Sequence, residues 1–223
     1  MKKIKTIIGA LAATGALSAA AVAASGCEQI LDTMANSPIF YTPDVMYNGQ
    51  EFQITRLATC KYEWKTDNDA LHIEKRTVGS DPEVAFCTAS VTSPATVTLT
   101  ATNPDKADEP PVERKVEVRP WNLAVYSQDG KQKLGHTLNT NTVYLIRMVS
   151  GNSPVEGDIM KNKTDKWALE WARIGVAAAT GLGEPPAHSF YIKTGSRTVN
   201  AAITATLNGT TESLEVEVVA ADL

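Results

Sequence analysis

Ala95-Thr96-Val97-Thr98-Leu99-Thr100-Ala101-Thr102 alternates small or apolar residues with threonines along its whole length. A period of two is typical of a β-strand that buries one face and exposes the other, because successive side chains point to opposite sides. The β-branched valine and threonines also favour a strand over a helix. The turn-forming sequence Asn103-Pro104-Asp105 follows directly and should end the strand.

The same alternation recurs on both sides of this run. It is found in residues 51–57, 60–64 and 112–118, which are bounded by turn-forming sequences such as Asn48-Gly49 and Gly79-Ser80-Asp81-Pro82. Many short strands at this spacing are typical of a β-sandwich or a β-barrel. The sequence therefore predicts an all-β fold.

The second half of the chain repeats the first half in the same order. The matching segments are residues 52–57 with 143–148, 62–64 with 169–171, 99–103 with 203–208, and 116–118 with 216–218. Such a repeat indicates an internal duplication of one strand-rich unit. Pro120 cannot donate a hydrogen bond within a sheet, so the boundary should fall at Arg119-Pro120-Trp121. We predict a first domain at residues 38–119 and a second at residues 120–223.

Both copies resemble bacterial Ig-like domains of the intimin and invasin group. That family reads as a Trp-containing strand, an A-T-(V/I)-T-A-T strand and a final V-x-V strand. The matching residues are Trp64, residues 95–101 and Val116-Glu117-Val118 in the first copy, and Trp171, residues 201–206 and Val216-Glu217-Val218 in the second. The resemblance implies two tandem Ig-like β-sandwich domains that serve as spacers, adhesins or interaction modules.

The N-terminus has the order of a secretory signal peptide. Three lysines within residues 2–5 precede an uncharged, alanine-rich stretch at residues 7–24, and small residues then lead to Cys27. We predict that residues 1–26 are a signal peptide that is removed. The alternative is a permanent anchor helix, since the uncharged stretch is about the length of a short membrane span.

Ala24-Ser25-Gly26-Cys27 resembles the lipobox of bacterial lipoproteins. The resemblance implies cleavage before Cys27 and a lipid on its sulfur, which would anchor the protein to a membrane. Residues 27–37 would then be a tether, or a short helix lying on the membrane. Glu28 follows the cysteine, where an aspartate commonly retains lipoproteins at the inner membrane. An outer-membrane location is therefore expected if the cell has one, facing either the periplasm or the outside.

Charge and motifs narrow the function classes. Loss of the three signal lysines takes the formal charge from −4 to −7, which argues against a nucleic-acid partner. No nucleophile elbow or phosphate loop is found. We therefore expect a protein that is not an enzyme, binds no cofactor, and has a binding, adhesion or spacer role toward a protein or glycan. The alternative is an accessory subunit of an envelope complex for secretion, pilus assembly or transport.

Two cysteines remain besides Cys27. In an exported chain, Cys60 and Cys87 are most simply interpreted as one disulfide. A metal site is the alternative, but it needs clustered ligands, and the histidines are far apart in the sequence. We predict the disulfide and no metal site.

The second copy carries extra residues that the first copy lacks. They lie between Arg147 and Leu169, and a second irregular stretch spans residues 175–186. Long loops on a rigid sandwich often carry binding specificity. The residues predicted to contact a partner are Pro154, Lys161, Lys163, Lys166, Pro185 and Pro186. Trp167 and Trp171 are expected to pack in the core, with a stacking surface or a helical pair as alternatives.

Overall fold

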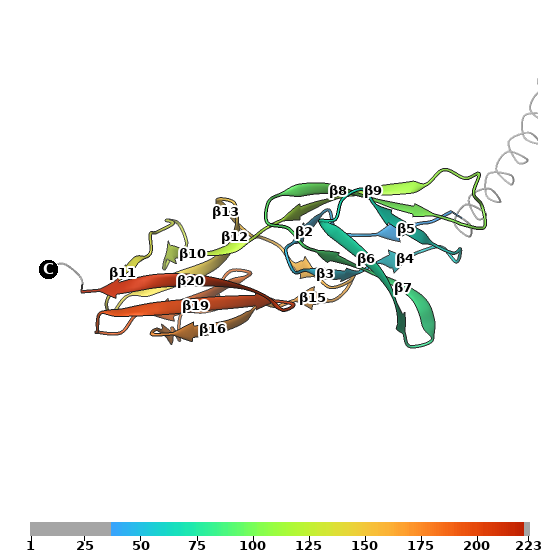
Figure 1. The fold of residues 1–223 in the computed structure, drawn as a ribbon. Coiled ribbons are helices and arrows are strands. Elements are labelled where there is room, and N and C mark those ends of the chain that lie inside the picture. The colour runs from blue at the N-terminus through green and yellow to red at the C-terminus, as the bar shows by residue number, and fades with distance from the viewer. Residues whose placement is uncertain (1–36, 221–223) are drawn as a thin grey trace, which may run out of the picture. The chain divides into compact units, whose positions relative to one another are not determined.

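The computed structural model describes residues 37–220, and these contain strands and turns but no helix (Figure 1). The predicted all-β class is confirmed. Contacts divide the chain into two compact units. Of the described residues, the larger unit contains 41–55, 65–99 and 114–220, and the smaller unit contains 37–40, 56–64 and 100–113. The predicted signal peptide and Cys27 lie outside the described residues.

Residues 40–119 form three sheets. One has the strand order β2-β9-β8-β5, another has the order β3-β7-β6, and β1 pairs with β4. The strands are β1 (Phe40–Tyr41), β2 (Val45–Tyr47), β3 (Glu51–Gln53), β4 (Thr55–Arg56), β5 (Glu63–Thr66), β6 (Leu71–Val78), β7 (Asp81–Ala89), β8 (Ala95–Thr102) and β9 (Val112–Arg119).

Residues 122–219 also form three sheets. Their strand orders are β11-β20-β19-β16, β10-β12-β18-β17 with β13 added beside β12, and the pair β14-β15. The strands are β10 (Asn122–Ser127), β11 (Thr137–Asn139), β12 (Val143–Ser150), β13 (Ser153–Pro154), β14 (Ile159–Met160), β15 (Lys166–Trp167), β16 (Glu170–Ile174), β17 (Ala177–Ala178), β18 (Ser189–Lys193), β19 (Val199–Leu207) and β20 (Thr210–Val219).

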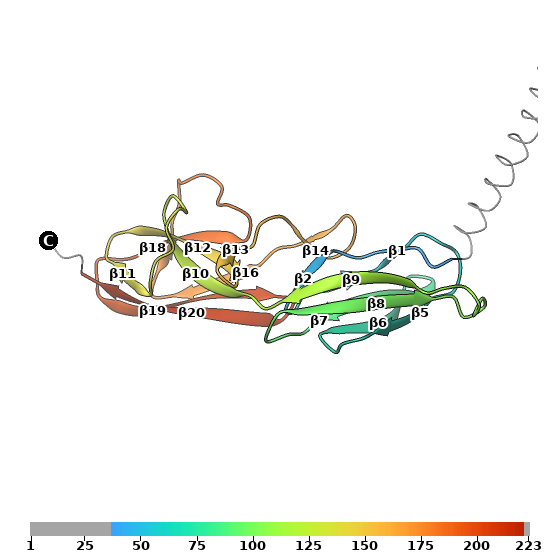
Figure 2. The ribbon, with the colours of Figure 1, turned by 90° about the horizontal axis from the view of Figure 1, so that it is seen from above.

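The strand order confirms the predicted duplication. The sheet β2-β9-β8-β5 has the same arrangement as β11-β20-β19-β16, and β3-β7-β6 matches β12-β18-β17. In both copies the first strand of the four-stranded sheet runs parallel to its neighbour. The A-T-rich runs become β8 and β19, which lie beside β9 and β20 in both views (Figures 1 and 2).

Each copy buries its apolar residues between two sheets, as in a β-sandwich. In the first copy, alternate residues of the A-T-rich run point inward, and Val97, Leu99 and Ala101 are fully buried. In the second copy, one core cluster joins the two sheets. Its members include Leu123, Val125, Ile146, Met148 and Ile192 from one sheet, and Leu138, Ile203, Leu207, Val216 and Val218 from the other. The predicted tandem sandwich class is confirmed.

The predicted Cys60–Cys87 disulfide is wrong for this structure, in which both thiols are free. Cys87 lies in β7 and is fully buried; its sulfur lies 3.7 Å from the Met46 sulfur and 3.5 Å from the Phe52 carbonyl oxygen. Cys60 lies in a bend. A strand was expected at residues 60–64, but β5 begins only at Glu63. The Tyr62 hydroxyl donates a hydrogen bond to the Ile39 carbonyl at 2.8 Å, so tertiary contacts fold this segment away from the regular alternation.

The two thiols should differ sharply in reactivity. Burial raises the pKa of Cys87 to about 12, so the sulfur is both protonated and shielded at neutral pH, whereas Cys60 is only partly buried. We expect maleimide to label Cys60 in the folded protein and to label Cys87 only after unfolding, as measured by peptide mass spectrometry. Equal labelling of both residues in the native protein, or recovery of a Cys60–Cys87 disulfide-linked peptide, would contradict the structure.

Candidate functional site

The extra residues of the second copy contain a short hairpin. Its strands β14 and β15 pair through Ile159 with Trp167 and Met160 with Lys166. The Asn162 side-chain oxygen accepts hydrogen bonds from the amides of Thr164 and Asp165, both at 2.8 Å. An asparagine that bonds to the backbone two and three residues ahead stabilises a tight turn. The predicted loop is thus an ordered hairpin.

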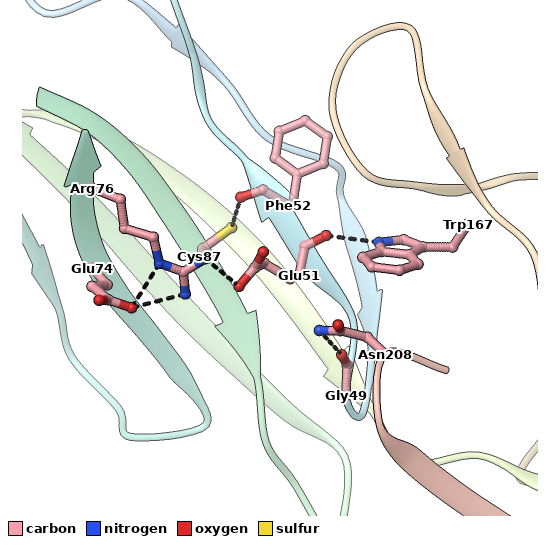
Figure 3. Close-up of polar contacts among 8 residues, drawn as sticks. All are labelled: Gly49, Glu51, Phe52, Glu74, Arg76, Cys87, Trp167 and Asn208. Carbon is pink, nitrogen blue, oxygen red and sulfur yellow. Dashed lines mark hydrogen bonds and ion pairs between the residues drawn. The ribbon is translucent and has the colours of Figure 1, made fainter. Parts of the chain in front are cut away.

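This hairpin covers the free edge of β3, and both elements belong to the larger compact unit. One edge of β3 pairs with β7, with Phe52 opposite Cys87. On the other edge, the Gln53 amide donates to the Lys161 carbonyl at 2.7 Å, and the Trp167 indole donates to the Glu51 carbonyl at 2.9 Å (Figure 3). Unpaired sheet edges are templates for unwanted pairing, and the hairpin satisfies two backbone groups of this one.

The turn that precedes β3 is held by three further contacts. Gln50 is buried, and its side chain donates to the Met160 carbonyl at 2.9 Å. The Asn208 side chain donates to the Gly49 carbonyl at 3.1 Å, as Figure 3 shows. The Trp121 indole donates to the Asn48 carbonyl at 2.9 Å. We call residues 48–53 and their five partners, Trp121, Met160, Lys161, Trp167 and Asn208, the β3 joint.

A charge cluster links Glu51 of β3 to Glu74 and Arg76 of β6. The Glu51 carboxylate pairs with Arg76 at 2.8 Å, and Arg76 also pairs with Glu74 at 2.8 Å (Figure 3). Hydrogen bonding from Arg76 holds the pKa of Glu74 below its ordinary value, and the same bond raises the pKa of Arg76. The Arg76 guanidinium also lies 4.7 Å from the Phe86 ring centroid. The Arg76 guanidinium thus lies between two carboxylates of the same sandwich, an arrangement that is typical of a structural cluster.

Two of the predicted partner-binding lysines have internal partners. The Lys161 ammonium lies 4.2 Å from the centroid of the Trp167 ring, a cation–π contact, and Lys166 forms an ion pair with Asp158 at 2.7 Å. Lys163 is exposed and has no ion pair within the described residues. The partner-binding role of these loops stays a prediction.

The three predicted prolines lie in different segments. Pro154 belongs to β13, opposite Val149, and Pro185 and Pro186 lie between β17 and β18. The Pro186 carbonyl accepts a hydrogen bond from the Ser189 hydroxyl at 2.5 Å. Trp167 and Trp171 pack against the core of the second copy, as expected, and both belong to strands rather than to a helix.

The residues of the β3 joint were missed from the sequence, apart from Lys161 and the core expectation for Trp167. The sequence predicts a turn at Asn48-Gly49, but nothing in it indicates what the backbone carbonyls of this turn contact. Gln50, which directly precedes the predicted strand, is the one residue that could have indicated the joint. A buried glutamine is costly unless both the oxygen and the nitrogen of its amide have hydrogen-bond partners. Its oxygen accepts from the Tyr47 amide at 2.9 Å, which completes that requirement.

Residues 37–220 can also be described for metal binding, membrane insertion and surface grooves. Among them, no group of three or more His, Cys, Asp or Glu residues is placed to hold a metal ion. The same residues include no helix of the length and apolarity needed to span a membrane. Two open grooves lie against β20, and the larger has a volume of about 500 Å³.

No protein-family model matches the sequence, and no curated protein matches it. Among solved structures, the chain is similar to the Escherichia coli adhesin FdeC, with 13% identity, 85% of this chain and 65% of that chain covered, and a TM-score of 0.29. The D0-D1 domain of intimin has 10% identity to this chain, with 80% of this chain and 95% of that chain covered and a TM-score of 0.28. Domains 4–9 of the surface layer protein SbsC have 13% identity, with 83% of this chain and 32% of that chain covered and a TM-score of 0.27. The chain thus spans less than two thirds of FdeC and of the SbsC fragment. Because every TM-score is low, these likenesses carry no argument about this chain.

Proposed function

We propose that this chain is a lipid-anchored protein of the cell envelope with a non-catalytic binding, adhesion or spacer role. The observation that carries the proposal is the β3 joint. Five hydrogen bonds tie residues 48–53 of the first copy to residues of the second copy. Tandem domains joined only by a short linker move independently by default, and such bonds oppose that motion. Coupled sandwiches suit a protein that presents a surface away from its anchor.

The anchor rests on Cys27, which follows the small residues of the lipobox-like sequence. Replacing Cys27 with serine should abolish lipid incorporation and leave an unprocessed precursor, because a hydroxyl does not replace the thiol in this transfer. Metabolic labelling with a palmitate analogue and intact mass measurement check both effects. A wild-type protein with a cleaved but unmodified N-terminus would refute the anchor and leave the spacer role standing.

The location of the folded part is tested on intact cells. We propose an outer-membrane destination, supported by Glu28 in place of aspartate after Cys27. Membrane fractionation tests this destination, and recovery with the inner membrane would contradict it. Protease added to intact cells removes the protein if it faces outward and leaves it intact if it faces the periplasm.

A further inference from the structure

The outer face of the sheet β11-β20-β19-β16 has an open groove of about 500 Å³. It lies along β19, between β16 and β20, and none of its lining residues belongs to the β3 joint. Its lining residues are His136, Ile174, Asn200, Ala201, Ala202, Glu215, Val216 and Glu217. A second groove shares His136 and Glu215 with it, so the hollow continues on the other side of Glu215.

Strand register explains why these side chains meet. Ile174 of β16 lies opposite Ala202 of β19, and Ala202 lies opposite Glu215 of β20, so the three form one row across the sheet. The neighbouring row pairs Asn200 with Glu217. Directly paired residues point to the same side of a sheet. Because the Ala202 side chain is short, the surface between Ile174 and Glu215 is hollowed. The result is a shallow trough with an apolar wall and an acidic wall.

The apolar wall is an exposed isoleucine. Ile174 is 74% exposed, the largest value among the exposed large hydrophobic side chains of the described residues. Gly175 follows it with φ of +79°, and a Cβ placed there would lie 3.0 Å from both the Ala201 Cβ and the Asn200 carbonyl oxygen. The chain therefore turns away directly after Ile174, which leaves this side chain uncovered at the mouth of the groove.

The acidic wall carries two carboxylates without cationic partners. Glu215 and Glu217 are exposed, and no lysine or arginine of the described residues forms an ion pair with either. By contrast, Glu74, Glu117 and Asp158 are each paired within 2.8 Å. Residues two apart on one strand face are separated by about 7 Å, which is also the spacing of alternate side chains on an extended partner. The groove therefore presents two negative charges in the register of a β-strand.

We propose that this groove binds an extended segment of a protein partner that carries lysine or arginine at alternate positions. The cationic groups pair with Glu215 and Glu217, and the aliphatic stem of such a side chain packs on Ile174 and Ala202. The inference rests on the binding part of the proposed function and is independent of the lipid anchor. It names a site outside the loops predicted from the sequence.

The test uses full-length protein in non-ionic detergent and a blocked hexapeptide probe in which lysine alternates with glycine. We expect saturable binding by fluorescence anisotropy, weakened by added salt because the contacts are ionic. The double substitution E215Q/E217Q should weaken binding about tenfold or more, and Ile174→Ser should weaken it several-fold. A peptide of the same charge with its three lysines adjacent should bind less tightly.

A matched control removes two charges elsewhere. Glu170 and Glu212 lie on β16 and β20 but do not line the groove, so E170Q/E212Q should bind like the wild type. No binding by the wild type, or equal loss in both double variants, would overturn the proposal.

Self-association that E215Q/E217Q abolishes would make a second copy of this chain the occupant of the groove. Binding of an amino-sugar oligomer in place of the peptide would make the occupant a glycan. Each of these two outcomes also overturns the proposal. An unlipidated protein that still binds the peptide would contradict only the anchor.

Discussion

Replacing Gly49 with alanine should lower the free energy of unfolding by about 2–4 kcal/mol, through two separate costs. Gly49 has φ of +82°, and this left-handed conformation costs an alanine about 1 kcal/mol. In addition, an added Cβ would overlap the Thr210 side chain and lie 3.0 Å from the Leu207 carbonyl oxygen. Forced contacts of this kind typically cost about 1–3 kcal/mol. Chemical denaturation followed by tryptophan fluorescence measures the sum.

Gly209 supplies the matched control. Its φ is +84°, nearly that of Gly49, but nothing lies within 4 Å of a Cβ placed on it. Gly209→Ala should therefore cost only the conformational part, about 1 kcal/mol. If the two alanine variants were equally stable, the close approach of Gly49 to Thr210 would be absent in solution, and that part of the account would be wrong.

Trp167→Ala should be similarly destabilising, by about 2–3 kcal/mol. The indole packs against the core of the second copy, donates to the Glu51 carbonyl and carries Lys161 over its ring. Full burial would make the loss of a tryptophan cost about 3–5 kcal/mol, and Trp167 is only partly buried. Urea denaturation measures the difference between the variant and the wild type.

Two further variants separate the contributions of Trp167. Trp167→Phe keeps most of the packing but leaves the Glu51 carbonyl without its donor, and it should cost about 1 kcal/mol. Lys161→Ala removes the cation–π contact and should cost about 0.5–1 kcal/mol. If Trp167→Ala cost no more than Lys161→Ala, the indole would not hold the hairpin to β3.

The fold was predictable because its signal is local. The period-two pattern of residues 95–102 reports directly which side chains are buried, and the repeat of that pattern around β19 reports the duplication. Prediction failed at residues 60–62, where the Tyr62 hydroxyl bonds to Ile39 and the chain bends before β5 begins. A contact between segments far apart in the sequence decided the conformation there. The disulfide prediction rested on export and on the number of cysteines, and neither shows that Cys87 is buried against Met46 while Cys60 lies in a bend.

The role of the extra hairpin was predictable only in part. Its extra length in one copy is visible in the sequence, and so is its mixture of lysines and turn residues. The sequence does not show that Lys161 and Trp167 bond to β3, because backbone carbonyls such as that of Glu51 leave no trace in residue identity. Exposed charge on a loop has the same appearance whether its partner is external or internal. The Glu215 and Glu217 groove was hidden for a related reason, since strand register alone brings Ile174 and Ala202 beside the acidic pair.

Amide hydrogen exchange at Gln53 tests the β3 joint most directly. The Gln53 amide is bonded to Lys161 of the hairpin, whereas the next amide, Ile54, is bonded to Ala85 at 2.9 Å. Ile54 therefore reports the first sandwich alone and serves as the internal control. We predict that both amides are protected in the full-length protein, and that Trp167→Ala accelerates exchange at Gln53 but not at Ile54. Unprotected exchange at Gln53 in the wild type, beside a protected Ile54, would contradict the joint.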